Sequence, residues 1–98
     1  MNYLGDKLRT LRESQGLLLR QAAAFVEVDT AFISKVERGE KKASREQVLK
    51  LAAFLSADKE QLIMLWLCDK IIDVVEDDPM AVEALKMALK NVKTAKWI

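Results

Sequence analysis

The stretch Phe32-Ile33-Ser34-Lys35-Val36-Glu37-Arg38-Gly39 decides the fold, because it joins a helical pattern to a helix stop. Ile33 and Val36 share one side of the helix that their spacing predicts, and polar residues occupy the other side. Glycine commonly follows the last residue of a helix. We therefore expect a short amphipathic helix over residues 30–37, with Asp29 as its N-cap.

Two helices are expected before this stretch and one directly after it. The first carries leucines at positions 4, 8 and 11 and ends at Gly16, and an alanine-rich second helix covers residues 18–25. After a polar loop, Ser44 followed three residues later by Gln47 is typical of a capping box. This pattern predicts a fourth helix over residues 45–55.

Two more apolar segments complete the chain. Asp58 caps a fifth helix that reaches Val75 and is apolar nearly all round. Asp78 at the cap and Pro79 in the first turn begin a sixth helix over residues 79–93, which has one apolar stripe. Glycine and proline are scarce, three and one in 98 residues. An all-α fold is therefore predicted.

Composition excludes several classes of function. No apolar run reaches the roughly 18 residues of a membrane span, and the amino terminus lacks the order of a signal peptide, so we expect a cytoplasmic protein. Cys68 is the one cysteine, and we interpret it as a small buried hydrophobe. The sequence has no histidine, and no metal cluster, activated nucleophile or phosphate loop can be assembled from it. We therefore expect neither an enzyme nor a bound cofactor.

The family is indicated by specific residues, because two helices joined by a turn are common and the net charge is only +1. The chain resembles the phage-repressor and Cro type (XRE) helix-turn-helix family from Leu4 to Leu62. The segments that carry the resemblance are Leu4-Gly5-Asp6-Lys7-Leu8-Arg9, Leu11-Arg12, Gly16-Leu17, the stretch from Phe32 to Gly39, and Leu49-Lys50-Leu51-Ala52. It implies a five-helix repressor-like helix-turn-helix domain over residues 1–67 and a C-terminal helical extension over residues 68–98.

The resemblance also implies roles in binding double-stranded DNA. The second helix would cross the DNA backbone, and the third, over residues 30–37, would enter the major groove. Lys35 can donate to guanine, and the methyl groups of neighbouring residues can contact thymine. The expected base-reading residues are Thr30, Ala31, Ser34 and Lys35. The alternative is that they are simply solvated positions of a packed helix.

Cations after the third helix are expected to contact phosphates, although a short charged loop is often merely solvated. In the family, the second helix usually begins with a hydroxyl cap and a glutamine that contacts a phosphate, whereas this chain has Leu18 and Leu19. Arg20 is therefore expected to supply that phosphate contact. The expected backbone contacts are Arg20, Arg38, Lys41, Lys42 and Arg45.

Four further positions matter for structure. Arg12 and Glu37 match family positions that form a salt bridge between the first and third helices. Glu27 replaces the usual turn glycine, so we expect it to adopt a left-handed conformation at a cost of roughly 1 kcal/mol. Ala43 replaces a frequent proline, which should only loosen the loop.

The extension is too short for a core of its own, yet it carries large apolar surfaces. It could pack back on its own subunit or form a helical dimer interface. We favour the dimer, because two recognition helices must lie roughly 34 Å apart to read a palindromic site. The expected dimerisation residues are Leu65, Trp66, Val82, Leu85, Leu89 and Val92.

The sequence thus predicts a sequence-specific regulator of transcription that binds double-stranded DNA as a homodimer. An antitoxin, whose extension would bind a partner protein, is the alternative. A control protein of a restriction-modification system would be a subtype of the first hypothesis.

Overall fold

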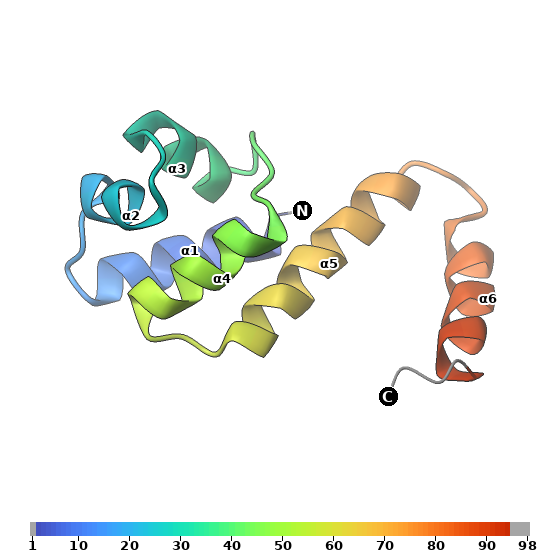
Figure 1. Cartoon of the computed structure of the whole chain (residues 1–98). Coiled ribbons are helices and arrows are strands. Elements are labelled where there is room, and N and C mark those ends of the chain that lie inside the picture. Colours follow the sequence, from blue (N-terminus) through green and yellow to red (C-terminus); the bar gives the residue numbers. More distant parts are fainter. Residues whose placement is uncertain (1, 95–98) are drawn as a thin grey trace.

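The computed structural model describes residues 2–94, and six α-helices follow one another over that range (Figure 1). They are α1 (Tyr3–Ser14), α2 (Leu19–Val26), α3 (Thr30–Glu37), α4 (Arg45–Leu55), α5 (Lys59–Val75) and α6 (Ala81–Thr94). No strand interrupts them within the described residues. The predicted all-α fold is confirmed.

Local hydrogen bonds explain why three of these helices begin where they do. The Asp29 carboxylate accepts a hydrogen bond from the Phe32 amide at 2.7 Å. Ser44 and Gln47 form a reciprocal capping box, with bonds of 3.1 and 2.9 Å. The Asp58 carboxylate accepts from an amide in the first turn of α5 at 2.9 Å. Each cap satisfies a backbone donor that has no partner inside its own helix. The N-caps predicted for α3, α4 and α5 are confirmed.

The sixth helix begins two residues later than predicted. Asp78 Oδ1 accepts from the Met80 amide at 2.8 Å, and the Asp78 carbonyl accepts from the Ala81 amide at 3.0 Å. These bonds hold Pro79 and Met80 in a turn, so that the first regular helical residue is Ala81. The prediction that Pro79 lies inside the first turn of the helix is therefore wrong.

The core lies among α1 to α5. Val48 of α4 and Leu62 of α5 are completely buried. They pack with the apolar sides of α1, α2 and α3, whose buried members include Leu8, Val26 and Ile33. Only the first part of α5 joins this core, and the helix then runs past it toward α6 (Figure 1). The expected boundary after residue 67 falls within this continuous helix.

Helix α6 stands apart from the core (Figure 1). None of its described residues is buried, and its apolar stripe of Val82, Leu85, Leu89 and Val92 is 39–59% exposed. A groove of about 740 Å³ separates α6 from α4 and α5, and Leu85 lies on one wall of it. In this structure, therefore, the extension does not bury its stripe against its own domain.

Candidate nucleic-acid interface

Helices α2 and α3 are joined by a tight turn at Glu27. The backbone of Glu27 is left-handed, with φ 66° and ψ 45°, as expected for a residue in the place of a turn glycine. The next amide, of Val28, donates to the Ala23 carbonyl at 3.0 Å and so closes the end of α2. This geometry directs the chain into α3 only three residues later.

Helix α3 has a buried side and an exposed side. Ile33 and Val36 are 2% and 3% exposed and fix the helix in the core. The predicted base-reading residues lie on the opposite side, because positions 30, 31, 34 and 35 share one face of an α-helix. Thr30, Ala31 and Lys35 are exposed, and Ser34 is half-buried. The structure therefore brings these four side chains together on one outer surface.

An ion pair fixes the end of α3 to α1. Arg12 Nε and Nη2 donate to the two carboxylate oxygens of Glu37 at 2.8 and 3.0 Å. The two side chains are only 12% and 7% exposed, and the hydrogen bond to Glu37 raises the pKa of Arg12 above its ordinary value. Arg12 also donates to the Leu17 carbonyl at 2.9 Å, just before α2. One guanidinium thus connects α1, α3 and the start of the helix-turn-helix.

Arg38 is engaged within the chain. Its guanidinium pairs with Glu40 at 2.6 Å and donates to the Ser34 hydroxyl on the recognition face. The hydrogen bond from Arg38 lowers the pKa of Glu40 below its ordinary value. Two predicted DNA contacts, Ser34 and Arg38, are therefore bonded to each other. Glu40 was not predicted as the partner of Arg38, although its opposite charge two residues away was a signal in the sequence.

The remaining predicted backbone contacts differ in their surroundings. Arg20, Lys41 and Arg45 are exposed. Lys42 forms an ion pair with Asp73 of α5, which lies 31 residues away in the sequence and was not predicted. No spacing or motif in the sequence could have indicated a partner so distant.

Trp66, one of the expected dimerisation residues, makes contacts within its own chain. The indole Nε1 donates to the Ala43 carbonyl at 2.7 Å, and both Trp66 and Leu65 pack against the core of their own chain. Their side chains are therefore used within the chain. The exposed apolar residues of α5 form a different stripe, at steps of three and four, that comprises Met64, Leu67, Ile71 and Val74. This stripe was not predicted, because the sequence of α5 is apolar nearly all round and does not distinguish one face from another.

Residues 2–94 offer no metal site and no membrane span. This range holds no group of His, Cys, Asp and Glu side chains that could bind a metal ion. Its helices are all too short or too polar to cross a membrane. Cys68 is free and half-buried.

Comparisons with known proteins agree with this geometry. The sequence model of the helix-turn-helix domain family matches residues 3–62. Among solved structures, the restriction-modification controller protein C.AhdI from Aeromonas hydrophila is 33% identical, with a TM-score of 0.58; the match covers 62% of this chain and 92% of that chain. The clp gene regulator ClgR from Corynebacterium glutamicum is 26% identical, with a TM-score of 0.61, over 93% of this chain and 86% of that chain.

An HTH_3 family transcriptional regulator from Vibrio cholerae is 28% identical, with a TM-score of 0.57, over 64% of this chain and 35% of that chain. No curated protein matches the chain at a significant level. The family match spans well over half of the chain and includes the whole of α2, its turn and α3. The chain therefore belongs to the helix-turn-helix domain family, as a DNA-binding transcriptional regulator of the XRE type.

Proposed function

We propose that the protein regulates transcription by binding a palindromic DNA site as a homodimer, with α3 of each copy in the major groove. The observation that carries this proposal is the division of α3 into two sides. One side is locked by the core and by the Arg12–Glu37 ion pair, while the other exposes short polar side chains and a lysine. A rigid helix with such an outer face suits the reading of base edges.

The proposed base contacts come from four residues. Lys35 donates to guanine O6 and N7, and the methyl groups of Thr30 and Ala31 contact thymine methyl groups. Ser34 donates or accepts once Arg38 releases its hydroxyl.

The proposed phosphate contacts fall into two groups. Arg20, Lys41 and Arg45 are exposed and available in the free protein. Arg38 and Lys42 must each release a carboxylate before they contact a phosphate. Both pairs are exposed, so the exchange costs little, but we expect these two cations to contribute less than the first three.

The proposed dimer uses the apolar surfaces of the extension. The α6 stripe and the α5 stripe are both exposed in the single chain. Each large apolar side chain contributes about 1.5–3 kcal/mol when fully buried, so the four residues of α6 offset much of the roughly 4–15 kcal/mol cost of association. The similarity to ClgR covers 93% of this chain and thus reaches beyond the helix-turn-helix domain.

We further propose that the protein is not an enzyme and acts in the cytoplasm, since its family is the helix-turn-helix domain family and its solved neighbours are a controller protein and a gene regulator. A role as controller of restriction-modification genes is a second candidate of the same kind. It is favoured by the similarity to C.AhdI, which extends over 92% of that protein. No observation favours the antitoxin alternative.

Selection from a pool of random DNA duplexes tests the proposal. We expect enrichment of a palindrome whose half-sites lie about one helical turn apart. The same selection with Lys35→Ala should yield a consensus that is relaxed at one base pair of each half-site. Absence of any enriched sequence would contradict the proposal, and a consensus without symmetry would contradict the dimer.

A further inference from the structure

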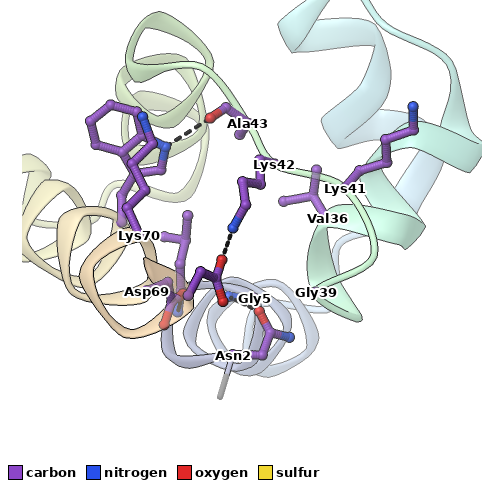
Figure 2. Close-up of a pocket in the computed structure, with 12 residues that line it drawn as sticks. Asn2, Gly5, Val36, Gly39, Lys41, Lys42, Ala43, Asp69 and Lys70 are labelled. Carbon is purple, nitrogen blue, oxygen red and sulfur yellow. Dashed lines mark hydrogen bonds and ion pairs between the residues drawn. The ribbon is translucent and has the colours of Figure 1, made fainter. Parts of the chain in front are cut away.

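One side of α5 faces the loop of residues 38–44, which joins α3 to α4 and carries the proposed phosphate contacts. Trp66, Asp69, Lys70 and Asp73 lie at positions i, i+3, i+4 and i+7 and therefore share that side. They line a small cleft of about 60 Å³. Figure 2 shows Asp69 and Lys70 at this cleft, with Lys42 reaching down into it and Lys41 pointing away. The exposed apolar stripe of α5 is made of other residues.

Trp66 holds the end of this loop that precedes α4. Its indole Nε1 donates to the Ala43 carbonyl at 2.7 Å, and Ala43 is only 4% exposed. Lys70 Nζ lies 3.8 Å from the centroid of the indole ring, and Arg45 lies 6.0 Å from it. The ring therefore has a fixed position from which it restrains the loop.

The other contacts restrain the same loop at further points. Lys42 is paired with Asp73 (Figure 2). At the start of the loop, Asn2 Nδ2 donates to the Glu37 carbonyl at 2.7 Å. Asn2 is itself placed by α5, because the Asp69 carboxylate accepts from the next two backbone amides at 3.0 Å each. Lys41 lies between these attachment points with its own side chain exposed.

We propose that Trp66 is a positioning residue for DNA binding, which holds the loop in the conformation in which Lys41 meets a phosphate, and that Asp73 restrains the same loop in the free protein until Lys42 turns to a phosphate. This inference rests on the proposed function and names residues that do not themselves contact DNA. A loop that is ordered before DNA arrives does not lose that conformational entropy on binding, so its contacts yield more affinity. Helix α5 thus contributes to DNA binding through the loop.

Trp66→Phe tests the proposal, since it keeps an aromatic ring and removes the N–H donor. At a temperature well below unfolding, we expect affinity for specific and for random DNA to fall by the same factor, about three- to tenfold, the value of one hydrogen bond. The factor is the same because phosphate contacts carry no sequence information. Unchanged affinity would overturn the proposal.

A double-mutant cycle separates positioning from general stability. Lys41→Ala should cost less affinity in the Trp66→Phe protein than in the natural one, because the loop no longer presents that lysine well. The control is Lys35→Ala, whose cost should be the same in both backgrounds. A merely structural tryptophan would lower the melting temperature and leave both costs unchanged. That result, or an equal change in both costs, would overturn the proposal.

Asp73→Asn provides a second, exposed variant that keeps the shape of the side chain. We expect faster hydrogen exchange of the loop amides at residues 40 and 41, which donate to the Lys35 carbonyl, with exchange in α2 unchanged as the control. Unchanged exchange in the loop would overturn the role of Asp73. This measurement needs no DNA and therefore tests the loop contact independently of the proposed function. Failure of the natural protein to bind any DNA would refute the proposed function but would not change the hydrogen-exchange result.

Discussion

Replacing Glu37 with alanine should destabilise the fold strongly. The substitution removes two charge-assisted hydrogen bonds, at 2.8 and 3.0 Å, from Arg12, whose side chain is only 12% exposed in the intact pair. The Leu17 carbonyl is then the remaining hydrogen-bond partner of its guanidinium. Loss of one member of a buried pair typically costs about 3–5 kcal/mol, which is a large part of the roughly 5–15 kcal/mol that stabilises a small domain. We therefore expect the melting temperature to fall by about 12 °C or more.

The matched control is Glu13→Ala, which removes an exposed partner of Arg9 within α1. That pair is 60% and 55% exposed and spans 3.4 Å, so its loss should cost about 0.3–0.5 kcal/mol. Denaturant titration followed by circular dichroism gives both free energies of unfolding. A double variant, Arg12→Met with Glu37→Leu, should recover much of the loss, because no unpaired charge is then buried.

A loss of stability in Glu37→Ala no greater than that in Glu13→Ala would contradict this prediction. The Arg12–Glu37 pair would then behave as a solvated surface pair, and it would not be what holds α3 in place. Recovery by the double variant separates the penalty for a stranded charge from a general intolerance of change at these positions.

Three further predictions concern DNA binding and assembly. Lys35→Ala should cost about 1–3 kcal/mol at the selected site and far less on random DNA, as measured by titration of both duplexes, and equal losses would show that Lys35 contacts only phosphate. Lys41→Ala should weaken binding to both duplexes and reduce the slope of log affinity against log salt by about one unit per contact in each subunit. Lys42→Ala should reduce this slope less, since Lys42 must first leave Asp73. Truncation after Asp77 should leave the domain folded and helical, because α6 contributes no buried residue to it, and light scattering should then show a monomer. A truncated protein that remains dimeric would place the interface on α5.

The extent of sequence-based prediction differs between the fold and the site. The helices were predicted with their ends within about two residues, because caps and helical periodicity are local signals. The four expected base-reading positions came from the resemblance, and the helical repeat alone is enough to place them on one face. The carboxylates that pair with Arg38 and Lys42 were not predicted, because nothing in the sequence distinguishes these two cations from Lys41 and Arg45.

The sequence by itself determined the helices, because each of their signals lies within one or two turns. Asp29 caps an amide three residues away, and Ser44 caps one at the same distance. The place of Glu27 in the turn was predicted from the resemblance alone, but its left-handed conformation also depends only on neighbouring residues.

Only the tertiary structure decided which side chains meet across the fold. Lys42 pairs with Asp73 over 31 residues, and Trp66 bonds Ala43 over 23 residues, because α5 packs beside the loop after α3. In the same arrangement, the first part of α5 packs in the core, and α6 lies beyond the core with its apolar stripe exposed.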